Sequence, residues 1–177
     1  AYHVILGRSI DDVMQIEKKV ISSEENRYFT KELIRLNDTD NKEFVNITVI
    51  TPLTEKIIRT VIWITNDGVN GLFDAKNELK PEIKELLSSN VKVVGADLFL
   101  QGNGFSLPSL NREVFRSLAH GMSTITHTFC YNRPLFAQRV NDILSIIKYL
   151  KNNDVNLEIS LAGFGRISAP LAIAASA

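Results

Sequence analysis

Residues 155–177 read V-N-L-E-I-S-L-A-G-F-G-R-I-S-A-P-L-A-I-A-A-S-A, and this stretch is the most informative in the chain. An apolar run typical of a strand enters a turn with two glycines, and a run of small residues typical of a closely packed helix follows. A sharp strand-to-helix turn of this kind can hold a nucleophile at its tip, in the pattern G-x-S-x-G. Here Gly163-Phe164-Gly165-Arg166-Ile167 places glycine at the tip. The stretch therefore predicts an elbow without its nucleophile, because glycine has no side chain that could attack a substrate.

The segments before the elbow alternate between strand and helix. Residues 57–65 and 90–98 are nearly continuous in β-branched and apolar residues, which is typical of strands covered on both faces. Residues 78–89 carry Pro81 in a first helical turn, and residues 134–150 place apolar side chains at helical spacing. This alternation predicts an α/β fold, with a mostly parallel sheet and flanking helices.

An antiparallel hairpin is expected on the amino-terminal side. Residues 28–36 and 44–51 form two strand-like runs separated by the polar sequence N-D-T-D-N-K. Before them, Ser9 is a capping residue for a short amphipathic helix, so we expect a helical extension over residues 1–27. We expect one domain over residues 1–177, and the sequence leaves open whether it is complete at its carboxyl end.

Composition excludes several classes of function. Twenty basic residues balance twenty acidic ones without a long block of either sign, so no nucleic-acid or membrane partner is expected. No apolar run approaches the roughly 18 residues of a membrane-spanning helix.

Cysteine and histidine usage predicts neither a metal site nor a cofactor. The single cysteine, Cys130, excludes an internal disulfide. His127 lies three residues before it, but no third group is evident to orient a Cys-His pair, which favours a bystander thiol. His3 and His120 add no spacing that would hold zinc.

With this order of elements, the chain resembles the first half of an α/β-hydrolase over residues 28–177. The matching motifs are I-W-I-T-N-D-G, A-D-L-F-L-Q-G, N-R-P-L-F-A-Q-R-V-N-D-I-L-S-I-I-K-Y-L and L-A-G-F-G. Within that superfamily it is most similar to acetyl xylan esterase and dienelactone hydrolase relatives, whose second motif often ends D-x-R-G-x-G and whose helix carries R-x-x-D. The resemblance implies a carbohydrate-ester ligand and a secreted or periplasmic location. The residues alone leave the compartment open, since the sequons at Asn37 and Asn46 matter only in a secreted eukaryotic protein.

The resemblance breaks down at the catalytic positions. Gly165 stands where the relatives have serine, the arginine expected after Asp97 is missing, and no acid and histidine follow the elbow in the required chain order. We therefore expect a catalytically degenerate or incomplete esterase-like module, a noncatalytic companion or scaffold for a partner chain or a second hydrolase domain. The alternative is one half of an active carbohydrate-ester hydrolase that another segment or chain completes.

Three loops follow strand ends and are expected to meet in one crevice: residues 66–68, residues 97–102 and residues 163–168. Asp67 and Gly68 occupy the loop where relatives place an oxyanion-hole N–H, although ordinary turn chemistry explains them equally well.

Two further residues in these loops are candidates for catalysis. Ser168 is a candidate substitute nucleophile, and its alternative is a small residue that lets a helix pack closely. Asp97 is a candidate general base, and its alternative is a structural carboxylate. Arg166 is expected at the surface.

Gly163-Phe164-Gly165 followed by Ser168 also nearly matches the dinucleotide fingerprint G-x-G-x-x-G/A. A dinucleotide-binding domain is therefore a second alternative. The acidic ribose ligand that should follow by about 20 residues is missing.

Overall fold

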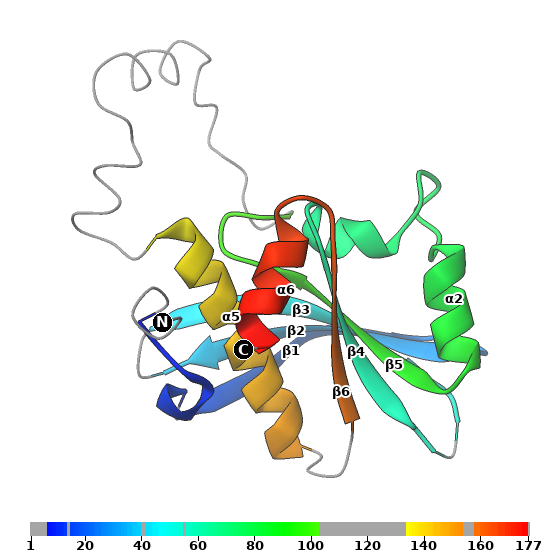
Figure 1. Cartoon of the computed structure of the whole chain (residues 1–177). Coiled ribbons are helices and arrows are strands. Elements are labelled where there is room, and N and C mark those ends of the chain that lie inside the picture. Colours follow the sequence, from blue (N-terminus) through cyan, green and yellow to red (C-terminus); the bar gives the residue numbers. More distant parts are fainter. Residues whose placement is uncertain are drawn as a thin grey trace.

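The computed structural model of the chain describes residues 7–13, 15–39, 42–54, 56–102, 134–153 and 158–176. These residues fold around a six-stranded sheet of order β1-β2-β3-β5-β4-β6 (Figure 1). In chain order the elements are η1 (Ile10–Asp12), β1 (Ile16–Glu25), β2 (Phe29–Asp38), β3 (Glu43–Pro52), β4 (Arg59–Thr65), η2 (Gly68–Leu72), α2 (Pro81–Ser88), β5 (Val91–Asp97), α5 (Leu135–Asn153), β6 (Glu158–Phe164) and α6 (Ser168–Ser176).

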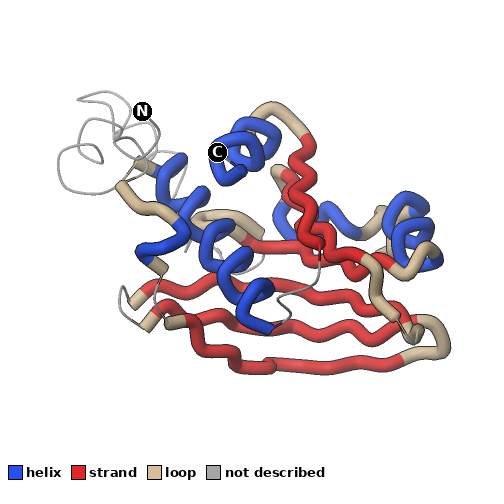
Figure 2. The backbone as a smooth tube through the Cα atoms, turned by 60° about the horizontal axis from the view of Figure 1, so that its bottom comes forward, coloured by secondary structure: helices blue, strands red, loops and turns tan. Residues whose placement is uncertain are grey.

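The central strands divide the core into two clusters, one on each face of the sheet. In β5, Val94 belongs to the larger cluster under α5 and α6, whereas Val93 belongs to the smaller cluster under η2 and α2. In β4, Ile62 belongs to the larger cluster, and Trp63 packs against the smaller one. Consecutive strand residues point to opposite faces, so burial on both sides explains why these two strands are nearly continuous in apolar residues. Figure 2 shows that the sheet is strongly twisted, with β6 crossing the long strands at a steep angle.

The sheet is mixed, so the prediction of a mostly parallel sheet is wrong. β4 pairs in parallel with β5 and with β6. Among the described strands, however, β1 with β2, β2 with β3, and β3 with β5 are antiparallel. The predicted hairpin of β2 and β3 is confirmed, and it extends the sheet because β3 pairs with β5. Parallel pairing is therefore confined to the strand-helix part of the chain.

The helix predicted after Ser9 is also wrong. Ser9 does begin a helical turn, and its N–H and hydroxyl donate to Asp12 Oδ2 at 2.6 and 2.8 Å, but only the short η1 forms. The following residues form strand β1 instead. Ile16 and Val20 are four positions apart, a spacing that places residues on one side of a helix and also on one side of a strand. The exposed edge of β2 offers this segment a full ladder of backbone hydrogen bonds, which decides for the strand.

The remaining predicted elements are confirmed where the structure describes them. Pro81 is the first residue of α2, and α5 follows the periodicity expected after residue 134. β6 runs into α6 through the predicted elbow. His3, His120, His127 and Cys130 lie outside the described residues. Within the described ranges, no helix combines the length and the apolar character needed to cross a membrane.

Candidate functional site

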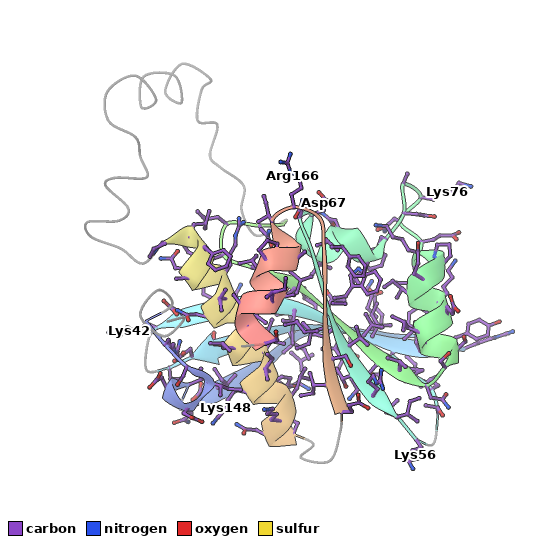
Figure 3. All side chains as sticks on the ribbon, viewed as in Figure 1. Lys42, Lys56, Asp67, Lys76, Lys148 and Arg166 are labelled. Carbon is purple, nitrogen blue, oxygen red and sulfur yellow. The ribbon has the colours of Figure 1, made fainter. Side chains whose placement is uncertain are left out.

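The three loops predicted to converge do meet at one end of the sheet. An open depression of about 410 Å³ lies among them. It is lined by Asn66, Asp67, Asn70, Leu100, Gln101, Gly102, Arg139 and Ile167. Figure 3 shows Asp67 and Arg166 projecting from this end of the molecule, opposite to Lys56. The carboxyl ends of β4, β5 and β6 therefore form one crevice, as parallel strands dictate.

The tip of the elbow is filled from a neighbouring strand end. Gly165 has φ +96°, in the left-handed region that favours glycine. A Cβ atom on Gly165 would lie 2.8 Å from Nδ2 of Asn66, which follows β4. Two residues earlier, in β6, a Cβ atom on Gly163 would lie 2.5 Å from the carbonyl oxygen of Ser168. Glycine at position 165 thus suits the turn, and glycine at position 163 allows the close packing of α6 on β6.

Asn66 also holds the first residue of α6. Ser168 is fully buried, and its hydroxyl donates to Asn66 Oδ1 at 3.0 Å. Its backbone N–H donates to the same oxygen at 3.3 Å. Asn66 therefore acts as a helix cap supplied by a different strand.

Asp97 folds the neighbouring loop around its carboxylate. Its Oδ1 accepts a hydrogen bond from the Val69 N–H at 2.8 Å. A side chain at Gly68 or at Gly102 would overlap the same carboxylate, and both glycines have positive φ angles. Thr65 Oγ1 donates to the Gly68 carbonyl at 2.9 Å, which closes the loop. The N–H that follows Gly68 is therefore directed at Asp97.

The R-x-x-D motif of α5 clamps the turn after β5. Asp142 Oδ2 accepts a hydrogen bond from the Phe99 N–H at 2.6 Å. Arg139 donates through Nε to the Phe99 carbonyl at 2.9 Å and through Nη2 to the Leu100 carbonyl at 3.2 Å. Leu100 has φ 57°, a conformation that costs a side-chain-bearing residue roughly 1–2 kcal/mol. The clamp offsets this strain by pairing the backbone groups of the turn.

The clamp residues have shifted pKa values. Burial raises the pKa of Asp142 to about 7, because it disfavours the ionised carboxylate. The negative charge of Glu43 raises it further, whereas the Phe99 N–H and the charge of Arg139 oppose the shift. Burial lowers the pKa of Arg139, and the charge of Asp142 opposes that shift. Asp142 can therefore exchange a proton near neutral pH.

The sequence places Asn66 in one of the converging loops but does not reveal its contact with Ser168. Asn66 and Ser168 are 102 positions apart, so no local pattern joins them. The stacking of Trp63 on Phe164, with ring centroids 4.1 Å apart across β4 and β6, is equally non-local. Among the described residues, no group of three or more histidine, cysteine or acidic side chains is placed to hold a metal ion.

A scan against protein-family models and a search of curated proteins find no match to this chain. A search of solved structures does find similar folds. A candidate acetyl xylan esterase from Bacteroides fragilis matches with a TM-score of 0.69 at 11% identity, over 98% of this chain and 46% of that protein. Acetyl xylan esterase 1 from Thermoanaerobacterium matches with a TM-score of 0.61 at 14% identity, over 99% and 53%. A glucuronoyl esterase from Solibacter usitatus matches with a TM-score of 0.56 at 12% identity, over 91% and 48%.

The chain thus spans about half the length of the esterases that it matches. At identities this low, the similarity shows a common fold and nothing about function. The expected fold class is confirmed at this level, with the correction that the sheet is mixed. The described residues of this chain have the α/β fold of the acetyl xylan and glucuronoyl esterases, that is, the fold of the α/β-hydrolases.

Proposed function

We propose that this chain is an esterase-like module that does not hydrolyse esters by itself. The observation that carries the proposal is the packing of Asn66 against the elbow tip. Gly165 at the tip has no side chain that could attack an ester, and a Cβ atom there would lie 2.8 Å from Nδ2 of Asn66, whose side chain occupies the space beside the tip. The elbow therefore joins the sheet to α6 without supplying a nucleophile.

In this proposal the two candidate catalytic residues have structural roles. The hydroxyl of Ser168 is buried and already donates to Asn66, so it does not face the crevice. The carboxylate of Asp97 accepts the Val69 N–H and packs against Gly102. Among the described residues, neither arrangement includes a base next to a nucleophile, which covalent catalysis requires.

The surface beside the elbow supports the role of a companion or scaffold. Phe164 at the end of β6, Ile167 in the elbow and Ile173 in α6 are 45%, 51% and 65% exposed. Among the described strands, β6 pairs only with β4, so its outer edge offers unpaired backbone groups. An exposed apolar patch beside such an edge is typical of an interface with a partner chain or a second domain.

An aryl-ester assay tests the absence of hydrolysis. We expect the wild-type chain and its Ser168→Ala and Cys130→Ala variants to release p-nitrophenol from p-nitrophenyl acetate at the rate of buffer alone. Turnover by the wild-type chain that is lost in Ser168→Ala and kept in Cys130→Ala would overturn the proposal, because it would make Ser168 the nucleophile.

A second candidate function is one half of an active carbohydrate-ester hydrolase, completed by another segment or chain. The open edge of β6 favours it, because a further parallel strand could continue the sheet there. Native mass spectrometry of the particle, with identification of any chain that co-purifies, separates the two candidates. A second chain that brings esterase activity to the complex supports the half-enzyme, and an inactive complex supports the scaffold.

Dinucleotide binding is less favoured by the elbow. Pyrophosphate would need the N–H groups at the start of α6, but the Ser168 N–H already donates to Asn66. We expect the fluorescence of NADH to be unchanged by the chain, and an enhancement that is lost in Gly163→Val would revive this alternative.

A further inference from the structure

A second cavity lies at the same end of the sheet, between the start of β3, the turn after β5 and the first turns of α5. Its volume is about 280 Å³, and it shares Leu100 and Gln101 with the crevice at the elbow. The cavity is lined by Lys42, Glu43, Phe44, Asn46, Asp97, Leu98, Phe99, Leu100, Gln101, Gln138 and Asp142. We refer to it as the α5 pocket. Figure 3 places Lys42, at the turn between β2 and β3, on the same side of the molecule as the start of α5.

Carboxyl groups outnumber basic groups in the α5 pocket. Glu43, Asp97 and Asp142 line it, against a single basic side chain, Lys42. Among the described residues, no basic side chain lies within ion-pair distance of Asp142. Arg8 lies 3.8 Å from Glu43, but it is engaged in a closer, buried ion pair with Asp38. Two further arginines stand against the lining, since Arg35 stacks on the Phe44 ring at 4.4 Å and the charge of Arg139 acts on Asp142. The lining side chains by themselves therefore favour a cation over an anion when Asp142 is ionised.

A buried amide in the lining lacks a hydrogen-bond partner. Gln101 is only 9% exposed, and among the described residues nothing pairs with its Oε1. A buried acceptor left without a donor costs roughly 1–3 kcal/mol. Gln101 lines the α5 pocket. An N–H group of a ligand would complete the hydrogen bonding of Gln101.

Apolar side chains around the pocket are unusually exposed. Phe44 is 57% exposed, and Phe99 and Leu100 are 46% and 43% exposed. The last two belong to the turn that Arg139 and Asp142 clamp in a strained conformation. Strain maintained by a surrounding clamp is characteristic of ligand-binding segments. The pocket thus joins an acidic, acceptor-rich interior to an apolar rim.

We propose that the α5 pocket binds a small organic ammonium ion, whose N–H groups donate to Asp142, Glu43 and Gln101 and whose apolar body packs on Phe44 and Phe99. The volume suits a ligand with one ring, since pockets for drug-sized ligands begin at about 300 Å³. The site uses neither Gly165 nor Ser168, so its success or failure is independent of the absence of ester hydrolysis.

Three ligands of the same shape test the proposal by isothermal titration calorimetry: benzylammonium, benzyl alcohol and benzoate. We expect benzylammonium to bind with a Kd of about 1 mM, benzyl alcohol at least about tenfold more weakly, and benzoate not at all at about 10 mM. Amide NMR resonances of the turn after β5 should move during the benzylammonium titration. Equal affinity for the alcohol, or binding of benzoate alone, would overturn the proposal.

Charge-removing variants locate the site. Asp142→Asn retains an oxygen for the Phe99 N–H and removes the charge, so we expect benzylammonium affinity to fall about tenfold. Glu43→Gln is expected to lower it about threefold, because Glu43 is more exposed. Asp74→Asn is the matched control, since that carboxylate lies outside the lining and accepts the Lys76 and Glu78 N–H groups of an exposed turn. Unchanged affinity in a folded Asp142→Asn protein overturns the site, and if that variant does not fold, unchanged affinity in Glu43→Gln does so.

Discussion

The elbow and the α5 pocket lie at the same end of the sheet but differ in how completely their polar groups are paired. At the elbow, Asn66 fills the space beside Gly165 and accepts both hydrogen bonds from Ser168. In the α5 pocket, Gln101 has an unpaired oxygen among the described residues, and burial raises the pKa of Asp142 to about 7. At the elbow the polar groups pair with one another, whereas in the α5 pocket the Gln101 oxygen has no partner among the described residues.

This difference separates groups that serve the fold from groups that suit a ligand. A buried polar group without a partner destabilises the folded protein, so the unpaired Gln101 oxygen has no evident role in stability. The strained Leu100 belongs to the same region. By this criterion the turn after β5 is a better candidate for ligand binding than the elbow, to which the sequence motif draws attention.

The largest effect is expected from a side chain at the elbow tip. Gly165→Ser should lower the free energy of unfolding by about 3 kcal/mol, because the left-handed backbone and the overlap with Asn66 both add cost. Urea unfolding monitored by tryptophan fluorescence measures it. If the free energy of unfolding is unchanged, the elbow accommodates a side chain at position 165. The elbow would then not be more tightly filled than the α5 pocket.

Two companion variants isolate the overlap. Gly7 has φ +65° with nothing near the position of a Cβ atom, so Gly7→Ser should cost only about 1 kcal/mol. The double variant Gly165→Ser/Asn66→Gly should be less destabilised than the sum of its single variants, because removing the Asn66 side chain frees the space.

The next effect is a pH dependence of stability that originates in the α5 pocket. The pKa of Asp142 is about 7 in the folded protein against 3.8 for an unperturbed carboxyl, so the folded state binds the proton more tightly. The stabilisation contributed by Asp142 should be complete below about pH 4, fall as the pH rises towards 7, and be lost above it. We expect the protonated carboxyl to add about 2 kcal/mol to the free energy of unfolding. This is roughly half of what the pKa shift would give at 1.36 kcal/mol per unit, because the side chain retains some contact with water.

Unfolding of wild type and Asp142→Asn between pH 4 and pH 8 measures this contribution by difference. The variant lacks the titrating group, so the stability of wild type relative to the variant should decrease as the pH rises. The groups that set the shift are Glu43 on β3, Arg139 on α5 and the Phe99 N–H of the turn. If the difference in stability between wild type and variant does not change with pH, the pKa of Asp142 is not raised in the folded protein, and the α5 pocket does not differ from the elbow in this respect.

The sequence predicts the central elements because their signals are local. The apolar runs of β4 and β5 and the periodicity of α5 each lie within one element, and the structure confirms all three. The sequence of β1 also fits a helix, because residues four positions apart lie on one side of either a helix or a strand. Only pairing with the edge of β2 selects the strand. The mixed character of the sheet has the same origin, since the pairing of β3 with β5 is a tertiary choice.

The site could be predicted in outline only. Strand ends indicated which loops converge, because parallel strands carry their loops at one edge. The partners within the crevice could not be predicted: Asn66 reads as part of a turn, and its contact with Ser168 spans 102 positions. The pairing of the Phe99 N–H with Asp142 spans 43 positions and is likewise set by the packing of α5.

The smallest effect tests whether the elbow is held by hydrogen bonds as well as by shape. Asn66→Ala and Ser168→Ala should each cost about 1 kcal/mol, because each leaves one half of the cap without its partner. The double variant should cost less than the sum of the two, with a coupling energy of about 0.5–1 kcal/mol. Strict additivity would mean that the buried Ser168 hydroxyl gains nothing from Asn66. The elbow would then have an unpaired polar group of its own, and the contrast with the α5 pocket would be lost.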